Sequence, residues 1–211
     1  MLIETKNKEI ENMRSVMKCK QCALLGIMGM ARTIQLIKHI AIHDKFQRMQ
    51  YFEIFIWGGL KKILYNDRAI NNKIEKGIEI CNSLIPVLKE YDSSDDFDEQ
   101  DHLLMQLKYS LIEKWYYFID VLFYDMNSKD CKVLIQYSTV AGERIYAYLR
   151  VWYRVKYHID TSRRVEAIEE NPIYRKELDI IDDDIRFVQE KHNNSEIKQR
   201  IREYIKYKFW E

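Results

Sequence analysis

The stretch EQDHLLMQLKYSLIEKWYYFIDVLFYDM, residues Glu99–Met126, decides the fold class. Its apolar residues recur every three or four positions and form two adjacent stripes. The first stripe is Leu104, Leu107, Leu111, Trp115, Phe118 and Leu122, and the second is Ile112, Tyr116, Ile119 and Phe123. This period is that of an α-helix, and the two stripes together cover well over half of its circumference. We therefore expect a buried central helix over about 99–126.

The composition extends this expectation to the whole chain. Only 6 Gly and 2 Pro occur among 211 residues, whereas sheet proteins need many turns. With 47% hydrophobic residues, the chain can build a large core, which excludes a disordered protein. The sequence thus predicts one all-α domain over 1–211, a compact bundle of about seven to nine helices.

Two further segments place the helices around the central one. The stripe that contains Leu25, Arg32 and Leu36 predicts a helix over the first forty-odd residues, kinked near Gly26 and Gly29.

In the segment after residue 160, Asn171-Pro172 predicts a helix start, because Asn caps helices well and proline fits the first helical position. Tyr174, Leu178, Ile181, Ile185 and Val188 then form an inward stripe, and Asp182-Asp183-Asp184 is expected to face water or a partner.

The number of cysteines and the length of the apolar segments indicate where in the cell the protein is located. The apolar run Cys22–Ala31 is half as long as a bilayer requires, and the acids ahead of it are unlike a signal peptide. The 4 Cys are too few and too scattered for a disulfide scaffold. These features predict a cytoplasmic protein with free thiols and no membrane partner.

Two stretches carry a resemblance to a known family. The first is IEKGIEICNSLIPVLKEYDSSDDFD (Ile74–Asp98), and the second is IEENPIYRKELDIIDDDIRFV (Ile168–Val188). Their "IP" step, "DDFD" loop and "ENP" cap occur in the order found in the bacterial YjaG-like family of unknown function, which the chain resembles over about residues 31–190. The resemblance implies a compact helical bundle and no transferable catalytic residues. It also implies that the N-terminal helix 1–30 and the C-terminal helix 195–211 are extensions of the family-like core.

Motifs for catalysis and cofactors are absent from the sequence. There is no GxSxG, no P-loop and no dinucleotide-binding glycine pattern, so we expect no catalytic residues and no cofactor. His39 and His43 have a spacing that allows two imidazoles to bind one metal, but no third ligand is visible. Cys19-Lys20-Gln21-Cys22 has half of a zinc-site pattern without its second half. A metal-dependent enzyme around the two histidines is therefore only an alternative.

Acid-rich segments predict a protein partner. The candidate binding residues are Asp92, Asp95, Asp96, Asp98, Glu99, Asp101, Asp179, Asp183 and Glu190. Such surfaces mimic phosphate and fit the basic cleft of a nuclease. Without a catalytic motif, the chain is predicted to be a protein-binding module, a bacterial immunity protein that binds and neutralises a cognate toxin domain.

Basic and aromatic residues after residue 143 predict a different partner. The candidate face consists of Arg144, Tyr146, Arg150, Tyr153, Arg154 and Tyr157, and Lys156, Arg163 and Arg164 extend it. Arginine contacts phosphate and tyrosine stacks on bases, so this face suggests a nucleic-acid-associated protein. The same residue types are enriched at protein interfaces, and the net charge of +1 argues against a general polyanion binder.

Overall fold

The computed structural model confirms the all-α prediction. The residues that it describes are 2–40, 50–66, 72, 74–79, 82–83, 99–125, 129–157, 161–207 and 209. The elements over these residues are α1 (Leu2–Arg14), α2 (Cys19–Ile40), α3 (Gln50–Tyr65), α5 (Glu99–Asp120), the π-helical turn η2 (Val121–Asp125), the 3₁₀-helix η3 (Lys129–Thr139), α6 (Val140–Tyr157), α7 (Thr161–Glu169), α8 (Pro172–Gln189) and α9 (Asn194–Lys206). These described residues include no strand, and no helix among them is long and apolar enough to cross a membrane.

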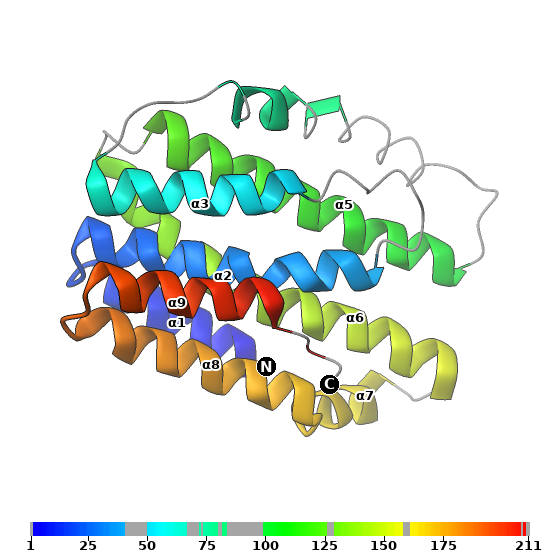
Figure 1. Cartoon of the computed structure of the whole chain (residues 1–211). Coiled ribbons are helices and arrows are strands. Elements are labelled where there is room, and N and C mark those ends of the chain that lie inside the picture. The colour runs from blue at the N-terminus through cyan, green and yellow to red at the C-terminus, as the bar shows by residue number, and fades with distance from the viewer. Residues whose placement is uncertain are drawn as a thin grey trace.

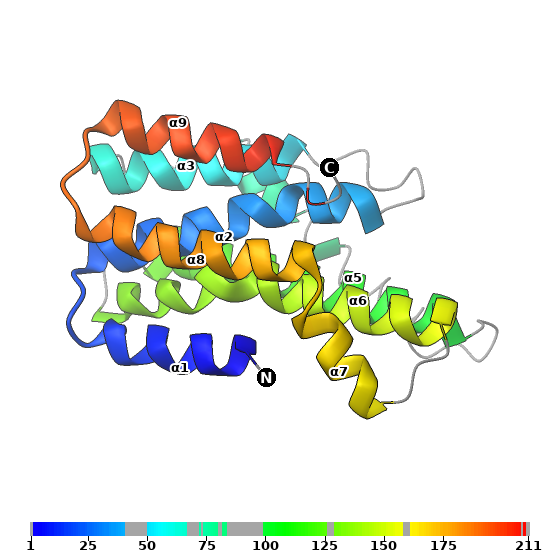
Figure 2. The same ribbon diagram turned by 90° about the horizontal axis from the view of Figure 1, so that it is seen from below.

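Helix α2 runs through the middle of the bundle in both views (Figures 1 and 2). It packs against α3, α5, α6, α8, α9 and η3. Between Cys22 and Ile37, every side chain except that of Gln35 is buried. Helix α5 contributes the predicted stripe, with Trp115 and Phe118 fully buried, but it exposes Tyr117 on its outer side. The helix that is buried all round is therefore α2, and α5 lies against it.

Two glycines allow η3 to approach the α2 backbone. A Cβ atom at Gly26 would lie 2.3 Å from the carbonyl oxygen of Leu134, and one at Gly29 would lie 2.2 Å from that of Tyr137. Contacts this short with a backbone atom cannot be relieved by rotating a side chain. Helix α2 continues through both glycines, and the predicted single helix over the first forty-odd residues is instead broken between Arg14 and Cys19. The two glycines allow the close packing of η3 against α2.

The predicted starts of the last two long helices are confirmed. Helix α8 begins at Pro172, and the Asn171 side chain accepts a hydrogen bond of 2.9 Å from the Ile173 amide. Helix α9 begins with a capping box, in which Asn193 accepts from the Glu196 amide and Glu196 accepts from the Asn193 amide. Each cap satisfies amides that have no partner within the helix.

A network of charged side chains crosses the core between α2, α8 and α9. The fully buried Arg32 donates from Nε to Glu177 Oε1 at 2.7 Å, from Nη1 to Asp184, and from Nη2 to the Ser138 carbonyl at 2.9 Å. Asp184 Oδ1 accepts from Arg200 Nε at 2.8 Å and from the Tyr204 hydroxyl at 2.6 Å. The two arginines and two carboxyl groups thus offset each other's charge, as buried charges require.

This network corrects the prediction that Asp182-Asp183-Asp184 faces water or a partner, which is wrong for Asp184. Asp184 is buried, whereas the side chains of Asp182 and Asp183 are 47% and 54% exposed and pair with Lys6 and Arg186. Consecutive helix residues point about 100° apart, so three acids in a row reach three different environments.

The buried carboxyl of Glu177 predicts a pH dependence of stability. Burial raises its pKa to about 7 against the opposing attraction of Arg32. Because this folded-state pKa lies above the unfolded value, the folded protein is stabilised by the protonated form of Glu177. That stabilisation is fully present below about pH 4.5 and is lost as the pH rises through 7. We expect the unfolding free energy of the protein, relative to Glu177→Gln, to fall by on the order of 1–3 kcal/mol over this range. Urea unfolding at several pH values measures it, and a constant difference would contradict the prediction.

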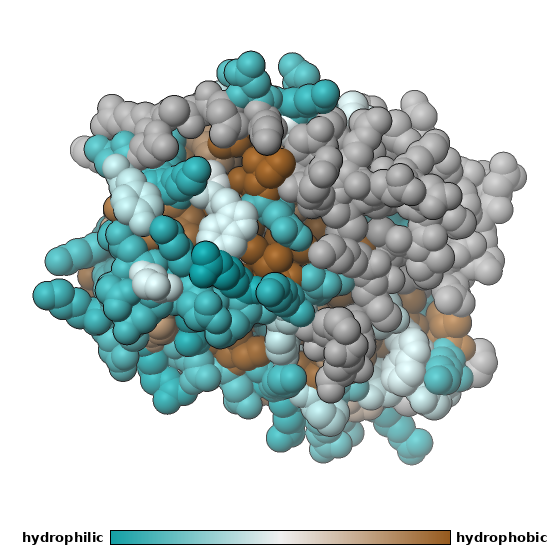
Figure 3. Space-filling view, in the orientation of Figure 1, coloured by the Kyte–Doolittle hydropathy of each residue, from teal (hydrophilic) through white to brown (hydrophobic). Residues whose placement is uncertain are grey.

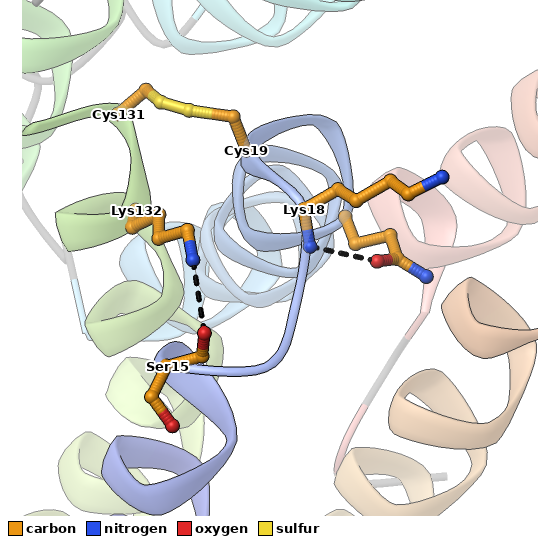
Figure 4. The surroundings of a disulfide bond; sticks show 6 residues. Ser15, Lys18, Cys19, Cys131 and Lys132 are labelled. Atoms are coloured by element: carbon orange, nitrogen blue, oxygen red, sulfur yellow. Dashed lines mark hydrogen bonds between the residues drawn. A yellow bond between two sulfur atoms is a disulfide. The ribbon is translucent and has the colours of Figure 1, made fainter. Parts of the chain in front are cut away.

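A disulfide bond joins Cys19, at the start of α2, to Cys131 in η3 (Figure 4). Beside it, Lys132 Nζ donates a hydrogen bond of 3.2 Å to the Ser15 carbonyl, which ties η3 to the turn after α1. The prediction of free thiols is wrong for these two cysteines. Cys22 is free and buried, and Cys81 lies outside the described residues. A cytoplasmic location loses the support that it drew from free thiols, because disulfides are typical of oxidising compartments.

Candidate functional site: an arginine pocket

Helices α5, α6 and α7 line an open pocket of about 440 Å³. Its described lining residues are Gln106, Leu107, Ser110, Arg144, Ala147, Arg150, Val151, Arg154 and Arg164. Four of them carry a guanidinium group and none of them is acidic. The pocket therefore concentrates positive charge in a chain whose formal net charge is only +1.

Helix periodicity explains why α6 supplies most of this lining. Arg144, Ala147, Val151 and Arg154 follow one another at spacings of three and four, so they lie along one side of the helix. The small side chain of Ala147 leaves room between the arginines. Helix α7 then brings Arg164 to the same pocket from a separate segment of chain.

Helix α5 holds the innermost arginine in place. The Arg144 Nη1 group donates a hydrogen bond to Ser110 Oγ, and its Nη2 group lies 3.6 Å from Glu143 Oε2. Its Nε atom is buried and has no hydrogen-bond partner in the described part of the chain. Arg150 and Arg154, in contrast, are exposed. The pocket thus combines one positioned guanidinium with others that reach toward solvent.

The chemistry of this lining suits phosphate groups. Guanidinium groups donate paired hydrogen bonds to phosphate oxygens and keep their charge at any physiological pH. On the α5 side, the Ser110 hydroxyl accepts from Arg144 and donates to the Leu107 carbonyl at 3.0 Å, so it positions Arg144. From Arg144 to Arg154 the helix extends about 15 Å, which is longer than one phosphate group. A ligand with repeated phosphates would match this extent.

The arginines of the predicted face line the pocket, whereas its tyrosines are not among the described lining residues. Arg144, Arg150 and Arg154 meet at the pocket, as the sequence suggested. Tyr146 is buried, and its ring centroid lies 5.6 Å from that of Tyr174. Burial also raises the pKa of the Tyr146 hydroxyl above its ordinary value. Tyr146 is therefore not part of an exposed face, whereas a face made of the arginines with Tyr153 and Tyr157 stays a prediction.

The other two tyrosines pack elsewhere along α6. Tyr153 accepts a hydrogen bond of 3.2 Å from Asn171 Nδ2, and the exposed Tyr157 ring lies 5.1 Å from that of Trp152.

The sequence analysis missed two pocket residues on α5, Gln106 and Ser110, because α5 was interpreted only through its apolar stripes. Polar residues beside those stripes were the available signal.

Most of the predicted acidic surface lies outside what the structure describes. Asp92, Asp95, Asp96 and Asp98 fall outside the described residues, as do the side chains of Glu99 and Asp101. The remaining three acids are exposed on or just after α8. Asp183 pairs with Arg186, and Glu190 Oε2 lies 3.3 Å from His192 Nε2. Binding of a cognate toxin domain stays a prediction.

The metal hypotheses gain no support from the described residues. The His39 side chain and all of His43 lie outside them, so this pair stays untested. The bond from Cys19 to Cys131 removes Cys19 as a thiolate ligand, and Cys22 is buried in the core. Within the described ranges, no three His, Cys, Asp or Glu side chains are grouped closely enough to hold an ion.

Comparisons with known proteins do not point to a function for this chain, so the functional argument rests on the arginine pocket. No protein-family model, no curated protein and no solved structure matches the chain. The resemblance to the YjaG-like family accordingly stays a prediction based on short motifs.

Proposed function

We propose that this protein binds the phosphate backbone of a nucleic acid in the arginine pocket. The observation that carries the proposal is that four arginines from α6 and α7 line one open pocket with no acid among the described lining residues. Phosphate contacts of this kind provide most of the affinity of nucleic-acid-binding proteins without reading sequence.

Two features favour a polymer over a small phosphate. The arginines of α6 line the pocket over about 15 Å of the helix, which is longer than one phosphate group. A site for a single small anion would enclose it with converging, buried donors, whereas Arg150 and Arg154 in this pocket are exposed.

Binding of a labelled nucleic acid tests the proposal. We expect the protein to bind a short fluorescein-labelled DNA duplex, and affinity should fall steeply between about 50 and 200 mM salt as counterions compete. Replacing Arg150 and Arg154 together by Glu should weaken binding at least about tenfold and reduce the salt dependence, because phosphate contacts are lost. Fluorescence anisotropy gives both quantities.

The matched control is Arg163→Glu, which reverses the charge of an exposed arginine on α7 that does not line the pocket. It should weaken binding much less than the pocket variant. Equal losses in both variants would contradict a defined site. Tight binding of inorganic pyrophosphate without binding of the duplex would contradict a nucleic-acid ligand.

A further inference from the structure

A second basic groove lies on another face of the molecule, between α3 and α9. Its described lining residues are Trp57, Leu60, Lys61, Tyr65, Lys198 and Arg202, around a volume of about 740 Å³. On the face shown in Figure 3, pale aromatic and brown apolar side chains between α3 and α9 are bordered by teal polar ones. None of the described lining residues is acidic.

The groove alternates rings and cations in a regular order. On α3, Trp57, Lys61 and Tyr65 are spaced by one helical turn each, so they lie in a row on one side. On α9, Lys198 and Arg202 are also one turn apart. The Lys198 Nζ atom lies 5.1 Å from the centre of the Tyr65 ring, and the Arg202 guanidinium lies 5.8 Å from the Trp57 ring. Each ring therefore has its own cation from the opposite helix.

The end of α3 fixes the outer ring of this row. Asn66 has a left-handed backbone conformation with φ of 55°, which ends the helix directly after Tyr65. The Tyr65 ring remains 53% exposed. A hydrogen bond from Lys198 to the Tyr65 hydroxyl lowers the pKa of Tyr65 below its ordinary value. Leu60 is buried beneath the row and gives the groove an apolar floor.

We propose that this groove binds single-stranded nucleic acid, with bases stacked on Trp57 and Tyr65 and phosphates contacted by Lys61, Lys198 and Arg202. Aromatic rings stack on any base, and neighbouring cations follow the backbone, which is the usual chemistry of single-strand binding. Trp57 and Tyr65 lie about 12 Å apart along α3, so each ring would receive its own base.

A protein partner fits this groove less well. Tryptophan, tyrosine and arginine are also common in protein interfaces, but lysine is depleted there, and two of the three cations here are lysines. A groove with three cations and no described acid is better matched by repeated phosphates. An acidic protein segment is the competing occupant that the experiment must separate.

The experiment compares a fluorescein-labelled oligothymidylate with a duplex of the same length by fluorescence anisotropy. We expect the single strand to bind, and Tyr65→Ala to weaken its binding about tenfold, because one stacked base is lost. Lys198→Glu with Arg202→Glu should also weaken it and reduce its salt dependence. Tyr65→Ala should leave duplex binding unchanged, because paired bases do not expose their faces.

Two control variants have the same chemistry outside the groove. Tyr117→Ala removes a tyrosine that is 51% exposed on α5, and Lys8→Glu reverses an exposed lysine on α1. Both should bind oligothymidylate as the unaltered protein does. Equal affinity of the Tyr65→Ala variant, or binding of poly-glutamate in place of oligothymidylate, would overturn the proposal.

The same measurements separate this groove from the arginine pocket. Loss of duplex binding in the Arg150 and Arg154 variant concerns the pocket alone. Because the pocket would also contact the phosphates of a single strand, the groove variants are compared in the Arg150→Glu, Arg154→Glu background, where a loss of oligothymidylate binding concerns the groove alone. The inference on the groove therefore stands or falls independently of the proposed function.

Discussion

Replacing Arg32 by Met is expected to destabilise the protein by about 3–5 kcal/mol, because it leaves the buried Glu177 carboxyl without its cation and takes one of three donors from Asp184. Glu177 would lose its hydrogen bond to Nε and Asp184 its bond to Nη1, while both remain in the core. The Ser138 carbonyl would lose a donor as well. Urea unfolding followed by circular dichroism measures the loss as a lower midpoint with an unchanged slope.

A double-mutant cycle separates charge from packing in this prediction. In the Arg32→Met background, Glu177→Met should restore part of the lost stability, since it removes the buried carboxyl group that has lost its cation. In the unaltered protein, the same change should destabilise, because it leaves Arg32 with one acidic partner fewer. A loss below about 1 kcal/mol for Arg32→Met, or equal effects of Glu177→Met in both backgrounds, would show that the network contributes little.

The sequence contained part of this network without identifying it. Glu177 follows Tyr174 by three positions and Asp184 follows Ile181 by three, so both acids belong to the stripe that was predicted to face inward. Arg32 likewise interrupts an apolar run. Helix periodicity therefore indicates that each charge is buried. It does not indicate that residues 145 and 152 positions apart in the chain are partners, because that depends on how α2 and α8 pack.

The fold class and the helix starts were predictable because they depend on local chemistry. Asn171-Pro172 determines the start of α8 through one side-chain cap and one fixed backbone angle. The arginine pocket is different, because its lining comes from three helices. The spacing of Arg144 and Arg154 placed them on one side of α6, but it did not show that Ser110 and Arg164 lie against that side. Tertiary packing supplied this information.

The disulfide eluded prediction for the same reason. Cys19 and Cys131 are separated by 112 residues, and no spacing pattern links them. Their approach follows from the packing of η3 against α2, which Gly26 and Gly29 allow. The bond thus reinforces a contact that the backbone already makes, and it joins two segments that would be far apart on average in an unfolded chain.

Removing this bond by Cys131→Ser is expected to cost about 2–5 kcal/mol of stability, because the cross-link limits the freedom of a long loop in the unfolded chain. Unfolding in urea with and without a phosphine reductant measures the effect. The reductant should destabilise the unaltered protein by a similar amount and leave the variant unchanged, which separates the cross-link from the substitution itself. Mass spectrometry of a non-reduced digest should recover the peptides of Cys19 and Cys131 joined. If these peptides are separate and the reductant has no effect, α2 and η3 are held together by packing alone.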